Sequence, residues 1–250
     1  ASGPPAASCS TAGTIVGRRQ FVNPKSLLLK YKLQGDFTIG GRPLLLNYDP
    51  PDRMDEQDGF ATGLRVWDGG LVLAKYLERY VPTATAGRPR LRGLELGAGT
   101  GVAGLSFALM GQEVILSDIG EKQATRTRSN IERNEGHIAA MGGRASYESL
   151  DWTALPERGR FGAFDMVFAA DVIWHESLVD PFIQALAWAA SGPGLNEVLL
   201  SHKVRDEESV NRFETQVGLA GFVIQQRVPS EPILGDFGHP DVVIYHLRRR

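Results

Sequence analysis

The sequence predicts an α/β protein built on a twisted, mostly parallel, Rossmann-like sheet of seven strands. From Leu64 onward, short apolar runs typical of buried strands alternate with helical stretches, and such alternation produces a parallel sheet covered by helices on both faces. A glycine-rich turn joins the first of these strands to a helix. The last two apolar runs, 221–228 and 241–247, have no expected helix between them. They can therefore pair antiparallel at one edge.

The chain divides into three parts. Residues 1–17 are rich in Ala, Ser, Gly and Pro, and this composition predicts a disordered tail. Residues 18–60 are expected to form a small N-terminal β extension, with strands at 26–33 and 43–48. Residues 61–250 form the main domain.

The main domain begins with a helix that Asp68 can cap and that Pro82 is expected to end. Gly111 closes the next helix, and the acidic residues Glu207 and Glu208 suit the first turn of the last one. The expected strands are 90–96, 113–117, 145–150, 164–170 and 197–202, and the later helices are 100–110, 121–134, 177–190 and one capped by Asp206.

The overall composition argues against a nucleic-acid-binding, a membrane-spanning and a disulfide-bonded protein. The 250 residues carry a formal net charge of -2, which argues against a broad basic field for nucleic acid. No apolar run approaches the roughly 20 residues that span a bilayer. The single cysteine, Cys9, excludes an intramolecular disulfide. With no apolar signal segment, we expect a reducing compartment, the cytoplasm or the nucleus, and a monomer.

The run 94–101, Leu-Glu-Leu-Gly-Ala-Gly-Thr-Gly, leaves a strand and enters a helix. Glycines there let a ligand approach the backbone, at the strand end where open α/β sheets bind ligands. The spacing Gly99-x-Gly101-x-x-Gly104 fits a dinucleotide. The pattern Gly97-x-Gly99-x-Gly101, with Glu95 one residue before it, fits S-adenosylmethionine, whose aminoacid part Glu95 could meet through water. A purely structural turn is the third alternative.

S-adenosylmethionine is favoured by Glu95, by the glycines that begin directly at the strand end, and by downstream motifs that have no counterpart in a dehydrogenase. Three other places along the chain could contact this donor. Asp118 ends the second strand about 20 residues beyond the loop, where a carboxylate accepts ribose hydroxyls, although it could instead cap the following helix. Asp151 and Trp152 follow the third strand and could contact adenine, although an indole is often simply core. Trp67 could pack against the donor or anchor its helix.

Three segments resemble the methyltransferase-like protein-lysine methyltransferases (methyltransferase family 16): Gly-Leu-Arg-Val-Trp-Asp at 63–68, the glycine run at 94–101, and Ala-Asp-Val-Ile-Trp at 170–174. The ending 241–245 is similar to the family's last strand, and the resemblance runs from about Leu64 to Leu247. It implies S-adenosyl-L-methionine as donor, S-adenosyl-L-homocysteine as product, and a protein substrate such as a chaperone, translation factor or other ATPase. The donor contacts that it implies are Trp67, Gly97, Ala98, Gly99, Asp118, Trp152 and Ala170.

The resemblance also implies a substrate-side role for residues 171–174. Asp171 could orient an acceptor amine, or brace its loop. Trp174 could wall the acceptor channel and attract a methylated ammonium, or pack as core. The family usually has Tyr at this position, and an indole donates a hydrogen bond but cannot accept one. His175 could act as a base or lie in solvent.

We therefore predict a protein-lysine N-methyltransferase that acts on a folded partner without a metal. The alternatives are a methyltransferase for a small amine or a protein histidine, and a donor-binding regulator without catalysis.

Overall fold

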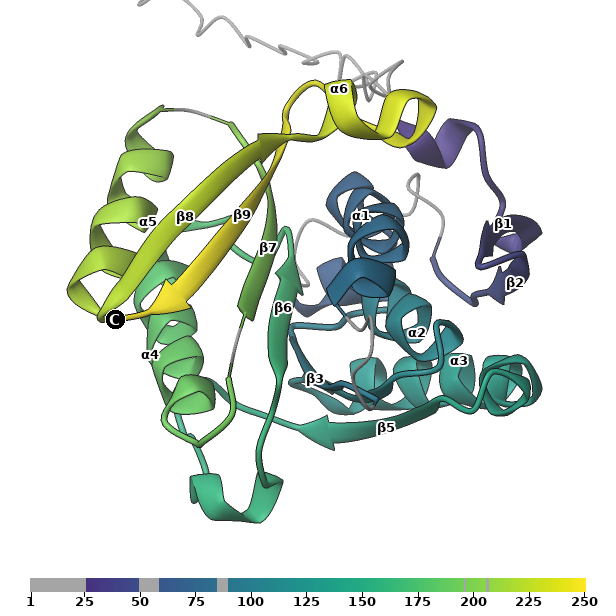
Figure 1. Ribbon diagram of the computed structural model, residues 1–250, viewed down its shortest axis with the longest axis horizontal. Coiled ribbons are helices and arrows are strands. Elements are labelled where there is room, and N and C mark those ends of the chain that lie inside the picture. The colour runs from purple at the N-terminus through teal and green to yellow at the C-terminus, as the bar shows by residue number, and fades with distance from the viewer. Residues whose placement is uncertain (1–25, 50–58, 85–89, 196, 206) are drawn as a thin grey trace, which may run out of the picture.

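The computed structural model describes residues 26–49, 59–84, 90–195, 197–205 and 207–250. Seven strands form one sheet in the order β5-β4-β3-β6-β7-β9-β8, in which β9 runs antiparallel to both neighbours and the other pairs are parallel. This architecture (Figure 1) confirms the predicted fold class. The strands are β3 (Arg92–Leu96), β4 (Glu113–Asp118), β5 (Arg144–Ser149), β6 (Met166–Ala170), β7 (Glu197–Lys203), β8 (Phe222–Pro229) and β9 (Val242–Arg249).

Helices cover both faces of the sheet (Figure 1). One hydrophobic cluster joins the N-terminal extension, α1 and α2 to one face, and a second joins α4 and α5 to the other. These apolar layers hold the sheet between the helices. The helices are α1 (Asp68–Ala84), α2 (Val102–Leu109), α3 (Glu121–Ala140), α4 (Val179–Ala190), α5 (Glu207–Leu219) and α6 (Ser230–Leu234), and the 3₁₀ turns are η1 (Leu27–Leu29), η2 (Gly59–Leu64), η3 (Arg158–Phe161), η4 (Glu176–Leu178) and η5 (Gly235–Phe237).

The register of the parallel strands brings their carboxyl ends to one edge. Leu96 at the end of β3 lies opposite Ser117 of β4, whose last residue Asp118 lies opposite Ser149 of β5. The Ser117 hydroxyl donates to the Glu95 carbonyl at 2.6 Å, which links β3 to β4 at this edge. The loops that follow β3, β4, β5 and β6 therefore meet around a common space.

The N-terminal extension differs from the prediction. The apolar run 26–33 was expected as a strand, but it forms the turn η1, and the hairpin strands are β1 (Gln34–Ile39) and β2 (Arg42–Leu45). A short apolar run does not reveal by periodicity whether it is extended or coiled. Gly40 and Gly41 make the hairpin turn with φ of +55° and +74°, the conformation that a two-residue turn requires.

Two helix ends and one additional helix also differ from the prediction. Pro82 lies inside α1 instead of ending it, so it removes one intrahelical hydrogen bond near the end of a helix that continues to Ala84. α3 passes through Gly136 to Ala140, because one glycine costs a helix only about 1 kcal/mol. The short helix α6 lies between β8 and β9, where a loop was expected.

Some predictions fall outside the described residues. They are the disordered tail 1–17, the start of the extension at 18–25, Cys9 and the Asp206 cap. The compartment inferred in part from Cys9 therefore stays a prediction.

Asp68 opens α1 and anchors η1. Its carboxylate accepts the Leu27 N–H at 2.8 Å and the Ser26 hydroxyl at 2.9 Å. We expect Asp68→Ala to lower the free energy of unfolding by about 1–3 kcal/mol, because it leaves a buried N–H unpaired. Asp36, an exposed carboxylate that accepts the Lys32 and Gln34 N–H groups, is the control. Urea unfolding should show a smaller loss for Asp36→Ala; equal losses would contradict the anchoring role.

Candidate active site

A cavity of about 380 Å³ lies at the carboxyl ends of the parallel strands. Its volume falls within the range typical of small-molecule sites, about 300–1,000 Å³. All eleven predicted site residues line this one cavity: Trp67, Glu95, Gly97, Ala98, Gly99, Asp118, Asp151, Trp152, Ala170, Asp171 and Trp174. The fold thus brings together residues from five separate segments of the chain.

The glycine loop requires residues without a side chain. Gly97, Gly99 and Gly101 have φ of +68°, +55° and +87°, a region that other residues rarely adopt. A Cβ on Gly97 would lie 2.7 Å from Val172 Cγ1, and one on Gly99 would lie 3.0 Å from the Gly63 carbonyl oxygen. The loop therefore leaves the cavity open on one side and packs closely against η2 on another.

Glu95 braces the loop from beneath. Its side chain is buried, and Oε2 accepts the N–H of Gly104 in α2 at 2.9 Å. Burial raises the pKa of Glu95 to about 8, and the nearby Asp118 charge adds to the increase. This bond ties Glu95 to the first turn of the helix that follows the loop.

Asp118 joins β4 to the glycine loop. Its two carboxylate oxygens accept the N–H groups of Gly99 at 2.6 Å and Ile119 at 2.7 Å, while burial raises its pKa. The alternative role, capping α3, is not what these contacts show, because one of them reaches back to the loop. The carboxylate thus reaches the loop while lining the cavity.

Asp151 and Trp152 form the wall that follows β5. Oδ1 of Asp151 accepts the Thr153 N–H at 2.8 Å and the Thr153 hydroxyl at 2.7 Å, and these bonds lower the pKa of Asp151. Trp152 packs edge-on against Phe182, with ring centroids 5.5 Å apart. The indole therefore belongs to the core and to the cavity wall at once.

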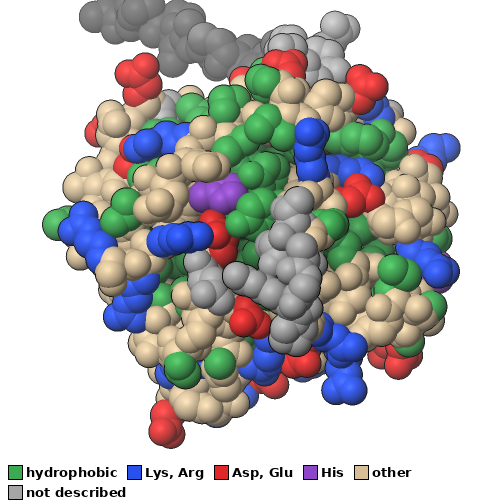
Figure 2. Space-filling view, in the orientation of Figure 1, with side chains coloured by type: hydrophobic (Ala, Val, Ile, Leu, Met, Phe, Trp, Pro, Cys, Tyr) green, Lys and Arg blue, Asp and Glu red, His purple; other side chains and the backbone are tan. Residues whose placement is uncertain are grey.

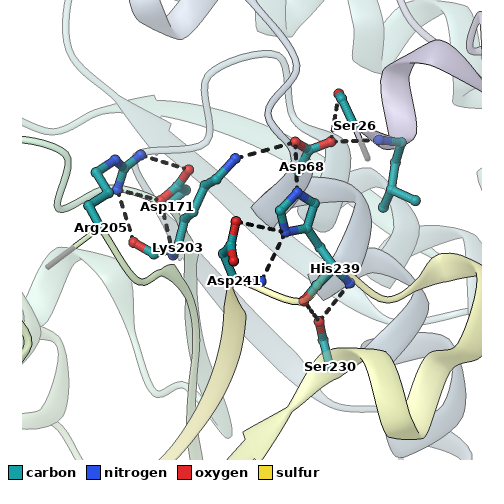
Figure 3. A network of polar contacts seen from close by, with 9 residues as sticks. Ser26, Asp68, Asp171, Lys203, Arg205, Ser230, His239 and Asp241 are labelled. Carbon is teal, nitrogen blue, oxygen red and sulfur yellow. Dashed lines mark hydrogen bonds and ion pairs between the residues drawn. The ribbon is translucent and has the colours of Figure 1, made fainter. Parts of the chain in front are cut away.

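Asp171 occupies a strained position at the end of β6. Its φ is +53°, and its carboxylate forms a bidentate pair with Arg205, with both N–O distances 3.1 Å. The Lys203 N–H donates to the same carboxylate at 3.2 Å. Figure 3 shows this pair beside a second group in which the Lys203 side chain and His239 approach Asp68. Asp171 is therefore already braced by β7 and the residues after it.

Two tryptophans line the cavity and remain accessible to solvent. Trp67 is 42% exposed and Trp174 is 45% exposed. The Trp67 indole donates to the Thr62 carbonyl at 3.0 Å, which fixes its orientation beside η2. His175 follows Trp174, but its Nδ1 caps η4 by accepting the Ser177 N–H at 3.2 Å. Trp174 is thus better placed than His175 to meet a second molecule at the cavity.

Sequence reasoning missed part of the lining. Ile119 and Thr153 directly follow predicted site residues, so adjacency could have identified them. Ser177 and Leu178 of η4 and Pro181 of α4 lie far along the chain, and no motif marks them. The other missed residues are Thr62, Gly63, Arg65, Gly70, Thr100, Val102, Ala103, Gln123, Leu150 and Val172.

The described residues contain neither a candidate metal site nor a candidate membrane-spanning helix. Within that part of the chain, no group of three or more His, Cys, Asp or Glu residues is placed to hold a metal ion. No helix there is long and apolar enough to cross a membrane.

The sheet order and the cavity define the class of fold. The structure is similar to that of the glycopeptide N-methyltransferase MtfA, with a TM-score of 0.52 and 17% identity over 72% of this chain and 90% of that one. It is also similar to that of the magnesium protoporphyrin IX methyltransferase ChlM from Synechocystis PCC 6803 with bound SAM, with a TM-score of 0.52 and 18% identity over 81% of this chain and 88% of that one. At these identities the likeness shows the fold alone, that of class I S-adenosylmethionine-dependent methyltransferases.

Sequence comparison then gives the family. The family described as "Lysine methyltransferase" matches residues 49–217, more than half of the chain, and the chain belongs to it. S-adenosyl-L-methionine is the cofactor of this family. Protein N-lysine methyltransferase METTL21A of Mus musculus is 35% identical over 58% of this chain and 63% of its own length. EEF1A lysine methyltransferase 3 of Mus musculus is 29% identical over 74% of this chain and 72% of its own length. The chain spans less than two thirds of the METTL21A proteins: 63%, 65% and 60% in Mus musculus, Danio rerio and Xenopus tropicalis.

The raised pKa of Glu95 makes stability depend on pH. The pKa of Glu95 is about 8 in the folded protein and about 4.3 in the unfolded chain. At a pH between these two values, Glu95 is protonated in the folded protein and ionised in the unfolded chain. The free energy of unfolding therefore falls as pH rises through this interval. Glu95→Gln removes the titration and keeps an acceptor for Gly104. We expect the Tm of Glu95→Gln relative to the parent to increase from pH 5 to pH 8.

Differential scanning fluorimetry across this range measures the effect. Glu121→Gln, a change at an exposed residue of α3, is the control and should give a flatter difference. If the Tm difference between Glu95→Gln and the parent changes with pH no more than that of the control, Glu95 is not buried in its protonated form.

Proposed function

We propose that the chain is an S-adenosylmethionine-dependent protein-lysine N-methyltransferase that acts on a folded partner protein. The observation that carries the proposal is the convergence of the eleven predicted residues on one cavity in a member of the lysine methyltransferase family. Relatives support a protein acceptor, since one is named for N-lysine methylation of proteins and another for a lysine of EEF1A. A chaperone, translation factor or other ATPase is the acceptor class that we propose.

The cavity fits the donor by its chemistry. The glycines leave space where a Cβ would clash with Val172, and the Asp118 carboxylate is suited to ribose hydroxyls. Trp152 offers an apolar ring face, and Asp151 an acceptor for an exocyclic amine. These residues, with Trp67, Gly97, Gly99 and Ala170, are proposed to hold the donor, which supplies an activated methyl group on a sulfonium when bound.

The protein's own task is then to place and deprotonate the acceptor. A free lysine has a pKa of about 10.4, so most of it lacks the lone pair needed for attack at neutral pH. Trp174 and Val172 line the cavity, and we propose that a lysine side chain inserted beside them is shielded from water, which would lower the pKa of its amine. We propose that Trp174 walls the acceptor channel and that Asp171 fixes the turn which presents it.

Donor binding is tested first. The parent protein should bind S-adenosylhomocysteine and not NAD in calorimetric titrations. Asp118→Ala removes the acceptor of the Gly99 N–H and the proposed ribose contact, so we expect its Kd to rise by about tenfold or more.

The control for this titration is Asp165→Ala. The Asp165 carboxylate also accepts a backbone N–H of β3, that of Arg92 at 2.8 Å, but at the opposite end of the strand. It should leave the Kd unchanged. Binding of NAD alone, or an equal loss in both variants, would overturn the donor-site assignment.

The acceptor is tested by methyl transfer. Labelled S-adenosylmethionine is incubated with the protein and a cell extract, and the modified peptides are mapped by mass spectrometry. We expect label on lysine in folded proteins, and its loss with Asp118→Ala or after heat denaturation of the extract. Label on histidine or only on free amines would favour the alternative acceptors, and donor binding without any product would favour a regulator.

A further inference from the structure

The buried face of α3 is polar. Gln123, Thr127, Asn130 and Asn134 recur at helical spacing, and all four side chains are at most 3% exposed. Buried polar groups need hydrogen-bond partners, and a helix face in contact with a core is normally apolar. For Thr127, Asn130 and Asn134 the partners include backbone groups of two other segments, the N-terminal hairpin with the residues that follow it and the glycine loop.

Two asparagines bind the open edge of the hairpin. Asn134 accepts the Leu45 N–H at 3.0 Å and donates to the Leu45 carbonyl at 2.7 Å. Asn130 accepts the Asn47 N–H at 2.7 Å and donates to the Asn47 carbonyl at 3.0 Å. Each side-chain amide therefore bonds both the N–H and the carbonyl of one residue, as a neighbouring β-strand would, so these backbone groups are not left unpaired.

The same helix face holds the glycine loop. The Thr127 hydroxyl lies 2.6 Å from the Gly99 carbonyl and 2.8 Å from the Gln123 carbonyl of its own helix, and its single proton is shared between them. The Asn130 amide donates to the Thr100 carbonyl at 2.9 Å. Because the C=O and N–H of a trans peptide point in opposite directions, fixing these carbonyls also fixes the N–H groups of the loop. Asn130 thus contacts the hairpin and the loop with one side chain.

We infer that Asn130 is a positioning residue for donor binding, and that through it the N-terminal hairpin helps to hold the glycine loop in its binding conformation. The inference rests on the proposed donor site. Asn134 makes the corresponding pair of bonds to Leu45 of the hairpin, and its amide also donates to the Asn130 carbonyl of the helix itself. The two asparagines therefore form a matched pair that differs in contact with the loop.

The test compares Asn130→Ala with Asn134→Ala in the full chain. Both variants lose the paired bonds to the hairpin, so both should lower the Tm. Only Asn130→Ala frees the Thr100 carbonyl, so we expect its Kd for S-adenosylhomocysteine to rise by about tenfold, and that of Asn134→Ala to stay within about twofold of the parent. Calorimetry gives the Kd, and scanning fluorimetry gives the Tm.

The outcomes separate this inference from the proposed function. If the parent itself does not bind S-adenosylhomocysteine, the donor-site assignment fails. If the parent binds and both variants bind equally well, Asn130 is only structural and the inference fails. Should Asn130→Ala yield no folded protein, Asn130→Asp replaces it under the same criterion, with Asn134→Asp as its control, since a carboxylate still accepts the Asn47 N–H but cannot donate to the Thr100 carbonyl.

Discussion

The parallel register of β3 with β4 and β6 is the constraint on which the site depends. It places Leu96, Ser117 and Phe168 at nearly one level, so the loops that follow these strands open into the same space. Side chains widely separated in sequence, such as Glu95 and Asp171, then face one cavity. The helices on both faces bury the sheet and leave its carboxyl edge as the place where a ligand can enter.

Within this frame the glycine loop is held by groups outside it. Asp118 binds the Gly99 N–H, and Thr127 and Asn130 bind the next two carbonyls. Such bonds matter because glycines lose much conformational freedom on ordering, and a loop that is ordered before the ligand arrives does not spend binding energy on ordering. Basic and acidic side chains are interspersed over the face of the molecule that Figure 2 shows.

The sequence predicted those parts whose signal is local. Strand–helix alternation gave the sheet, and the glycines and strand-end carboxylates located the cavity, because each precedes or follows an apolar run. The strand expected at 26–33 was wrong since its conformation depends on Asp68, a residue 42 positions after Ser26. Arg205 and the role of Asn130 were missed for the same reason, as their partners lie 34 and 83 positions away. Contacts at such separation leave no periodic pattern.

The pairing of Asp171 has a consequence for the acceptor. An unpaired carboxylate beside the channel would stabilise a lysine ammonium and raise its pKa, which opposes the loss of the proton that methyl transfer requires. Arg205 compensates this charge with a bidentate pair, and the Lys203 N–H adds a third bond. The acceptor side therefore presents a nearly neutral pair and an exposed indole. For a proposed lysine acceptor, this arrangement favours the neutral amine over its charged form, and it makes the αL turn at Asp171 useful for its geometry more than for its charge.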